Sequence, residues 1–483
     1  MSEQAERQTI AFLSNQTLTP VQKKLADRLE AQGYRCVWLV PGLRWDRWLA
    51  AQGVPETHRL ALHPLTKSSK KLSLASAKRI AGQWEQENRP TVAALIRMDR
   101  LMRDRPADRA WQILAAYGQA IEGFLKDQNV VACFGEQTWA WEMLTALIAR
   151  QQGRGCYFYS TVRIPSERWG LFEPITHRLV QWRVASAADT EWANAFLPEW
   201  RARPVKPFYA ASHPSALTFR RYWWDELRRR FGPTSDARTD ITVRPPLAAL
   251  KDRLRLAWNA ARLRLVPPFE AAPVQGRFVL FCLHHAPEAS IDVFGAPHSD
   301  QAHLLRRLSR LLPATHELWV KEHPDWLGDR SPAWLREIAA LPNVRLIAPS
   351  ESTFKLLQRA DLVVTITGTV GYEAALMGRP TVALAALFFD PLMRVSAADF
   401  PDPLLWPMTR LLTPPTEAAQ QRHDAECRDF LARLHANSFE GFPDRLARQT
   451  QEGRENPDEI QSIVLGLLAF LREAHPPAPP SAP

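Results

Sequence analysis

Short apolar runs alternate with longer amphipathic stretches along most of this chain of 483 residues. Short apolar runs are typical of buried strands, and apolar positions repeated at helical spacing are typical of helices packed on a sheet. Strands that alternate with helices predict a parallel sheet whose connections cross over its faces. The pattern therefore predicts an α/β protein.

The alternation occurs in two blocks, separated by a region in which it is lost. In the first block we expect strands at 9–14, 36–40, 130–134 and 156–159, helices at 20–32 and 138–151, and a helical insertion at 65–127. In the second block we expect strands at 278–283, 317–320, 344–347, 362–366 and 381–384, and helices at 299–312, 332–341, 352–359, 369–377, 417–435 and 458–473. Both blocks are typical of Rossmann-like domains.

Proline and arginine are frequent between the two blocks, and the last residues of the chain are rich in proline. These features predict an N-terminal Rossmann-like domain at 1–171 and an interdomain region at 172–276. A C-terminal Rossmann-like domain with closing helices is expected at 277–475, followed by a disordered tail at 476–483.

The chain carries a net charge of +10, which indicates an anionic partner. A nucleotide sugar, an acidic glycan and the inner face of a membrane all qualify, whereas the absence of nucleic-acid-binding signatures argues against nucleic acid. The five cysteines show no Cys-x-x-Cys spacing, which indicates reduced thiols and no zinc site. No signal peptide and no run of about 20 apolar residues is found, so a cytoplasmic protein is expected.

Thr367, Gly368 and Thr369 join an apolar run to a helix with almost no loop. Small residues let the backbone approach a ligand closely, and the N–H groups of a first helical turn favour an anion. Glu373 is expected on the next part of the same helix. The alternative is a tight joint with Thr369 as the N-cap, and the GxGxxG fingerprint of NAD sites is not matched.

Two other apolar runs of the second block end in histidine and proline. Lys321 and His323 are natural phosphate partners, and Pro324 would hold the chain extended. The alternative is a charged strand end in solvent. His284 and His285 should point to opposite faces, so at most one faces a ligand, and no third residue at suitable spacing suggests a metal.

Glu136 follows a strand of the first block and is a candidate general base or nucleophile. The alternative is that it caps the helix that begins near Thr138. Arg163 and Arg168 are expected to add positive charge to the same sheet edge. In the second block, Asp300 is expected to cap the following helix.

Basic and aromatic residues are interleaved over 220–265. One interpretation is a solvated helix packed by its tryptophans; the other is a peripheral contact with anionic lipid at the inner membrane.

Several of these motifs occur together in one known family. The segments 283–288, 300–301, 320–324, 341–345 and 366–374 resemble, in order and spacing, the bacterial capsule and surface-polysaccharide biosynthesis proteins, which include β-Kdo transferases. The resemblance covers about 278–387 and extends weakly to 134–136 and 436–438.

The resemblance implies a GT-B architecture, with two Rossmann-like domains facing across a cleft and the acceptor on the side of the first. It also implies a glycosyltransferase of capsular or O-antigen type that transfers a CMP-activated 3-deoxy-ulosonic acid, Kdo or a nonulosonic acid, to a glycan or glycolipid. The family's His-Pro motif is His323-Pro324 here. Its Gln-Pro-Glu motif is Ala286-Pro287-Glu288, so alanine replaces the glutamine and donor identity stays open.

The expected roles combine this resemblance with the strand-end and helix-start positions described above. Glu136, His323 and Glu288 are the expected catalytic residues, with Glu136 acting on the acceptor hydroxyl or on the sugar. The expected nucleotide and phosphate contacts are His284, Pro287, Lys321, Pro324, Thr367, Gly368, Thr369 and Glu373. No metal or cofactor is expected. Two alternatives remain: a sugar-nucleotide epimerase or hydrolase on the same fold, and a non-catalytic scaffold of glycan assembly.

Overall fold

The computed structural model describes residues 7–85, 90–205, 239–323, 327–398, 402–441, 446 and 456–475. It divides into two compact units. The first unit comprises Met1–Val184, Lys206–Pro246 and Asn437–Pro483, and the second comprises Ala185–Val205 and Leu247–Ala436. The expected tail at 476–483 lies outside the described residues.

The first unit is built on a seven-stranded sheet of order β13-β6-β5-β4-β1-β2-β3. Its strands are β1 (Thr9–Leu13), β2 (Arg35–Val40), β3 (Arg59–Ala61), β4 (Val130–Gly135), β5 (Gly155–Thr161), β6 (Arg168–Phe172) and β13 (Ser438–Glu440). The five strands from β3 to β5 pair in parallel, and β6 and β13 are antiparallel. The expected parallel sheet is confirmed for the four strands that the sequence pattern located.

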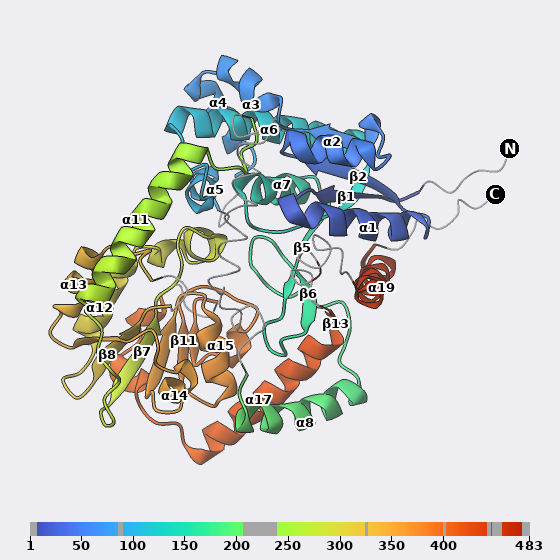
Figure 1. Cartoon of the computed structure of the whole chain (residues 1–483). Helices are drawn as coiled ribbons and strands as arrows, with labels where there is room; N and C mark the ends of the chain where they lie inside the picture. The colour runs from blue at the N-terminus through green and yellow to red at the C-terminus, as the bar shows by residue number, and fades with distance from the viewer. Residues whose placement is uncertain are drawn as a thin grey trace. The chain divides into compact units, whose positions relative to one another are not determined.

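Helices cover the first sheet (Figure 1). The helices of the first unit are α1 (Thr19–Glu30), α2 (Leu43–Ala51), α3 (Leu65–Ser68), α4 (Leu74–Gly82), α5 (Val92–Met98), α6 (Ala107–Asp127), α7 (Ala140–Gln151) and α19 (Pro457–Ala474). Of these, α3 and α4 pack on α6. Apolar residues of α1 and α19 form one buried cluster with Ile10 and Phe12 of β1. The sequence analysis placed α19 with the second domain, but its buried Ile463 and Leu467 pack in the core of the first unit. An apolar helix face does not reveal from sequence which of two sheets it covers.

The second unit is built on a six-stranded sheet of order β12-β11-β10-β7-β8-β9, in which every pairing is parallel. Its strands are β7 (Phe278–Cys282), β8 (Glu317–Lys321), β9 (Val344–Ile347), β10 (Leu362–Thr365), β11 (Thr381–Ala383) and β12 (Val395–Ser396). Its helices are α8 (Ala187–Ala202), α11 (Pro246–Leu265), α12 (Gln301–Leu311), α13 (Pro332–Ala339), α14 (Thr353–Leu357), α15 (Thr369–Leu376), α16 (Met408–Leu411) and α17 (Glu417–Ala436).

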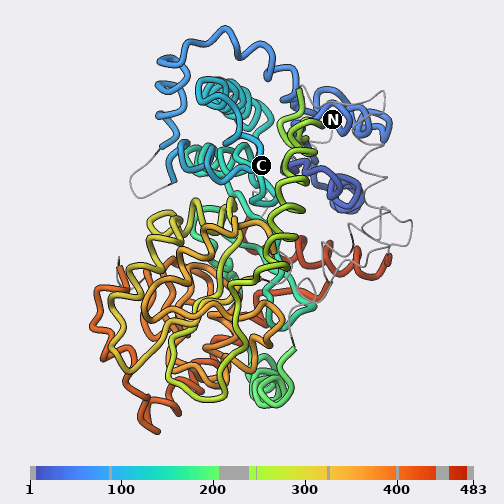
Figure 2. Tube along the Cα trace, turned by 60° about the vertical axis from the view of Figure 1, so that its left-hand side comes forward, coloured from blue at the N-terminus to red at the C-terminus, as the bar shows by residue number. Residues whose placement is uncertain are grey.

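Two helices from the expected interdomain region belong to the second unit. Helix α8 packs along α17, beside which it lies in Figure 1. Helix α11 is one continuous helix, drawn in green in Figure 2. The α/β fold class is confirmed by the two sheets, although the region at 172–276 is divided between the units.

Both sheets reverse their strand order next to the first strand of the unit. Strand β1 lies between β2 and β4, and strand β7 lies between β8 and β10. In each sheet, the loops that follow the two neighbouring strands at this point therefore diverge. This position is called a switch point, and it is where open α/β sheets bind ligands. Each unit thus has one such position, at β1/β4 and at β7/β10.

Candidate functional site

At the β7/β10 switch point, a histidine joins the ends of the two strands. His284 follows β7, and its Nε2 lies 3.0 Å from Oγ1 of Thr365, the last residue of β10. The same nitrogen accepts the backbone N–H of Thr367 at 3.3 Å. The sequence-predicted residues His284 and Thr367 are therefore brought together.

These contacts define the protonation state of the imidazole. The N–H of Thr367 can only donate, so Nε2 of His284 accepts and the ring proton resides on Nδ1. Thr365 Oγ1 accepts the N–H of Gly368 at 2.8 Å, which leaves the hydroxyl hydrogen to point toward His284. His284 is thus neutral and holds the start of α15 against β7.

Glycine is required at position 368 by this close packing. A Cβ atom there would lie 2.9 Å from Thr365 Oγ1 and 3.0 Å from His284 Nε2. Gly368 has an extended backbone and is the N-cap of α15, whereas Thr369 is its first helical residue. The expectation that Thr369 is the N-cap is wrong by one residue. Glu373 is buried further along the same helix.

A polar network supports the His284 loop from the side of β8. The side chain of Gln301 accepts the N–H of His284 at 2.9 Å and donates to its carbonyl oxygen at 3.0 Å. Arg330 donates to the same carbonyl oxygen and binds both oxygens of Glu322, at 2.8 and 3.1 Å. Asp300, as expected, caps α12 by accepting the N–H of His303 at 3.0 Å.

The Arg330–Glu322 pair is buried. The Glu322 side chain is 1% exposed and that of Arg330 is 12% exposed. Burial raises the pKa of Glu322, whereas the Arg330 charge and the N–H of His323 act in the opposite direction. His323 itself is exposed and donates that N–H to Glu322 at 2.9 Å. The exposed His323 ring therefore lies just after β8, at a position where the backbone is held by the Arg330–Glu322 ion pair.

Lys321 is placed differently from the expectation. It is buried, and its Nζ donates to the carbonyl oxygen of Pro349 at 3.0 Å. It therefore contributes positive charge to this sheet edge while bonding to the main chain. Pro324 lies outside the described residues.

The loop after β7 carries the remaining predicted residues of this edge. His285 points to a partner other than that of His284, with Nδ1 3.2 Å from Oδ2 of Asp329. Burial alone would raise the pKa of Asp329. The hydrogen bond from His285 and the neighbouring positive charges outweigh burial and lower this pKa. Pro287 and Glu288 follow, and Glu288 Oε2 accepts the hydroxyl of Ser290 at 3.1 Å.

At the β1/β4 switch point, an asparagine orients the predicted carboxylate. Asn15 follows β1 and donates from Nδ2 to Glu136 Oε2 at 2.9 Å. The indole N–H of Trp139 donates to Asn15 Oδ1 at 3.1 Å, and because an indole can only donate, the amide cannot be reversed. Thr138 Oγ1 lies 3.3 Å from the same oxygen of Glu136.

Two other carboxyl groups occupy the N-terminus of α7. Glu142 accepts the N–H groups of Thr138 and Trp139, each at 2.9 Å, and Asp99 accepts that of Ala140 at 3.0 Å. Burial, and next the charge of Glu136, raises the pKa of Glu142 well above its usual value. Burial also raises the pKa of Asp99. Glu142 and Asp99 therefore perform the capping that was the alternative for Glu136.

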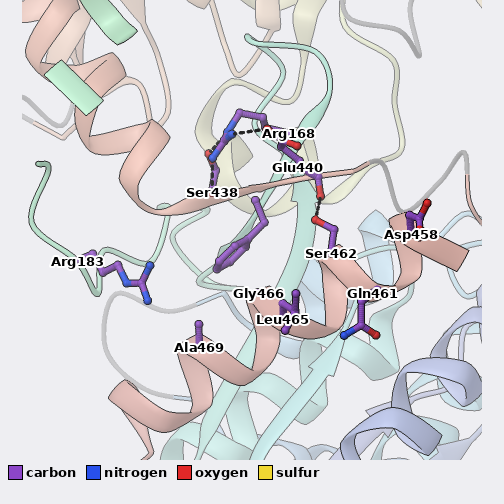
Figure 3. A pocket seen from close by; sticks show the side chains of 11 residues that line it. Arg168, Arg183, Ser438, Glu440, Asp458, Gln461, Ser462, Leu465, Gly466 and Ala469 are labelled. Atoms are coloured by element: carbon purple, nitrogen blue, oxygen red, sulfur yellow. Dashed lines mark hydrogen bonds and ion pairs between the residues drawn. The ribbon is translucent and has the colours of Figure 1, made fainter. Parts of the chain in front are cut away.

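The expected basic residues of this edge have structural partners. Arg168 begins β6 and binds Ser438 of β13, with 2.9 Å between Nε and Oγ. Arg163 donates its backbone N–H to Thr161 Oγ1 at 3.0 Å. Arg168 also lines an open hollow of about 560 Å³ between β6, β13 and α19 (Figure 3). In this hollow the hydroxyl of Ser462 donates to the carbonyl oxygen of Glu440 at 2.9 Å. This hollow is at the antiparallel edge of the sheet, two strands or more away from β4.

Sequence reasoning missed Asn15, Thr365, Glu322 and Arg330. Asn15 and Thr365 stand at strand ends, so the rule that selected Glu136 and Thr367 could have found them. Arg330 lies in a loop, and only its tertiary contacts reveal it. Within the described residues, no group of three or more His, Cys, Asp or Glu side chains is arranged to hold a metal ion.

Comparisons with known proteins support the resemblance drawn from the motifs. Residues 254–392 match the family model described as capsule polysaccharide biosynthesis protein, so the resemblance is confirmed over that segment. Over 64 residues the chain is 38% identical to the capsule polysaccharide modification protein LipA of Neisseria meningitidis serogroup B. That match covers 13% of this chain and only 9% of the length of LipA.

Solved structures of similar proteins share little sequence with this chain. The beta Kdo 2,7 transferase KpsC of Thermosulfurimonas dismutans is 12% identical, with a TM-score of 0.31, over 73% of this chain and 89% of that one. MurG of Acinetobacter baumannii is 12% identical, with a TM-score of 0.27, over 92% of this chain and 99% of that one. Among the described helices, none combines the length and the apolar character needed to cross a bilayer.

Proposed function

We propose that the chain is a glycosyltransferase of surface polysaccharide assembly with a GT-B architecture, because residues 254–392 match the family model described as capsule polysaccharide biosynthesis protein. The donor is a nucleotide sugar, for which a CMP-activated 3-deoxy-ulosonic acid fits the His-Pro motif, and the acceptor is a glycan or glycolipid. The observation that carries the proposal is that the β7/β10 switch point, with its histidines, Thr365 and Gly368, lies inside the matched segment.

The second unit would bind the donor. Transfer breaks the bond between the anomeric carbon and the phosphate oxygen of CMP, so negative charge grows on the phosphate. The exposed ring of His323, the buried charge of Lys321 and the N-terminus of α15 at Thr369 all favour negative charge at this sheet edge. His284 would act through α15, because its Nε2 is committed to Thr365 and Thr367. Glu288 would order the donor or bond the ribose.

The first unit would act on the acceptor through Glu136. The Asn15 amide donates to one carboxylate oxygen and orients the group, and Glu142 and Asp99 relieve Glu136 of capping α7. As a general base, Glu136 would take the proton of the acceptor hydroxyl while that oxygen bonds to the anomeric carbon. No step requires a metal or a cofactor.

The experiment that tests the donor is calorimetry with CMP, UDP and GDP on the purified protein. We expect selective binding of CMP, its loss in His323→Ala, and transfer at least about 100-fold slower in that variant, the lower end of the usual cost of an electrostatic donor. His303→Ala is the matched control, because His303 is exposed on α12 in the same unit. Preference for UDP or GDP would indicate hexose transfer or epimerisation instead, and binding of none would indicate a scaffold.

A further inference from the structure

Helix α11 carries apolar residues on two opposite faces, and only one of them is buried in the protein. On the buried face, Leu263 belongs to the core cluster of the second unit, and Ala249 is 5% exposed. Asn259 donates from Nδ2 to the carbonyl oxygen of Gly328 at 3.0 Å. This face anchors α11, the green helix of Figure 2, to the second unit.

The opposite face is an exposed apolar stripe. At 3.6 residues per turn, five large side chains fall within one narrow sector of the helix. They are Leu247, Leu250, Leu254, Trp258 and Leu265, with exposed fractions of 82, 55, 64, 65 and 81%. We call these five residues the α11 stripe. Isolated exposed leucines are ordinary, but an aligned set of this size marks an interaction surface.

Positive charge borders the α11 stripe on both sides. Residues 247–265 contain Lys251, Arg253, Arg255, Arg262 and Arg264 against one acidic residue, Asp252. The guanidinium of Arg262 lies 6.0 Å from the ring centroid of Trp258, so a cation and an aromatic ring of the stripe are adjacent. Arg255 donates to the carbonyl oxygen of Asp329 at 3.1 Å, which holds its positive charge at the helix.

We propose that the α11 stripe lies in the interface of an anionic phospholipid bilayer, with the helix parallel to the membrane plane. Leucine and tryptophan on one side of a helix, bordered by lysine and arginine, suit the boundary between acyl chains and negatively charged headgroups. Arg255 lies 3.9 Å from Asp252, and the remaining excess of four positive charges argues for this partner over an apolar protein surface, which would offer no counter-charges. Because the buried face already fixes the helix, binding requires no folding of α11.

This inference goes beyond the proposed function, since it concerns where the enzyme works and not what it transfers. The sequence analysis gave a membrane contact as one interpretation of residues 220–265, and the proposal assigns that contact to the α11 stripe. Residues 220–238 lie outside the described residues, and among the residues that the structure describes the stripe belongs to α11. A membrane surface would be where a glycolipid acceptor is presented.

The test is co-sedimentation of the whole chain with vesicles of phosphatidylcholine, alone or mixed with phosphatidylglycerol. We expect binding to the mixed vesicles and binding at least about tenfold weaker to phosphatidylcholine alone, since each cation near an anionic surface strengthens binding. Combining Leu250→Ser, Leu254→Ser and Trp258→Ser should reduce binding to the mixed vesicles at least about tenfold. Lys251→Gln with Arg262→Gln should reduce it roughly thirtyfold and weaken its dependence on salt.

The controls are Val274→Ser and Leu405→Ser, which remove exposed apolar side chains of the second unit outside α11. They should leave vesicle binding unchanged. Unaltered vesicle binding in the triple stripe variant would overturn the proposal, as would equal binding to both vesicle types. A wild-type dimer in light scattering that becomes a monomer in the stripe variant would identify a second copy of the chain as the occupant. Nucleotide binding measured on the same variants separates this result from the proposed function.

Discussion

The two switch points share their topology and differ in their chemistry. At β1/β4 the polar side chains around the loop are carboxyl groups, Glu136, Glu142 and Asp99. At β7/β10 they are a neutral imidazole and a hydroxyl, His284 and Thr365. The same arrangement of strands therefore places carboxyl groups at the helix start in one unit and uncharged acceptors at the helix start in the other.

The difference lies in how each helix start is satisfied. The first N–H groups of α7 are accepted by the carboxyl groups of Glu142 and Asp99. At the start of α15 the N–H groups of Thr367 and Gly368 are accepted by uncharged atoms. Under the proposed function, the first unit would accept a proton at Glu136 and the second would bind the anion.

The sharpest way to break this comparison is Glu136→Gln. The amide keeps an acceptor for Asn15 but cannot take a proton, so transfer should fall at least about 100-fold, as expected for a general base. Nucleotide binding should stay unchanged, because the donor groups belong to the second unit. Steady-state transfer assays and calorimetry on the same preparation measure the two effects.

Glu56→Gln is the control for this variant, since Glu56 is an exposed carboxylate of the same unit. Transfer by Glu136→Gln within a few-fold of wild type would remove Glu136 from the chemistry. The acidic character of the first switch point would then be structural only.

Arg330→Gln removes the side chain that holds the His284 loop at the second switch point. Removing the guanidinium leaves Glu322 buried without its counter-charge, which should lower the free energy of unfolding by about 3–5 kcal/mol. Combining it with Glu322→Gln should recover part of the loss, because no buried charge then remains unpaired. Urea unfolding of the single and double variants measures both values.

Arg336→Gln, at an exposed position of α13, should change the free energy of unfolding by no more than about 0.5 kcal/mol. If Arg330→Gln proves equally mild, the pair does not hold the His284 loop, and the network described here is incidental.

Much of the fold could be predicted from sequence, because apolar runs and helical periodicity are local properties. The expected strand at 344–347 agrees with β9, and the expected helix at 458–473 differs from α19 by one residue at each end. The unit to which α19 belongs could not be predicted, since it depends on contacts with β1 and α1 far away in the chain.

The site was predictable to the same extent. Strand-end reasoning placed Glu136, His284 and Thr367 directly after strands, and the structure has these positions at the two switch points. It could not assign the hydrogen bonds that decide their roles. Only tertiary contacts show that Lys321 bonds to Pro349 and that Glu142 performs the capping considered for Glu136.

A smaller effect extends the comparison to the buried histidines. His284 is neutral because of its hydrogen bonds, whereas burial, together with the charge of Arg163, lowers the pKa of His177 in the first unit to about 3. The unfolded chain binds a proton at His177 below pH about 6.5 and the folded chain does not. The contribution of His177 to the free energy of unfolding is therefore fully present above pH about 6.5. It decreases as the pH falls below that value, by about 1.4 kcal/mol per pH unit.

Between pH 7 and pH 5 this linkage should cost about 2 kcal/mol of unfolding free energy in the wild type. His177→Asn is the matched variant, because His177 has a φ of +50°, which asparagine tolerates, and an amide does not titrate. The difference in urea unfolding between the two proteins isolates His177, since buried acids such as Glu142 contribute equally to both. An equal loss of stability in both proteins would show that His177 is protonated in the folded state, and the first unit would then tolerate a buried positive charge.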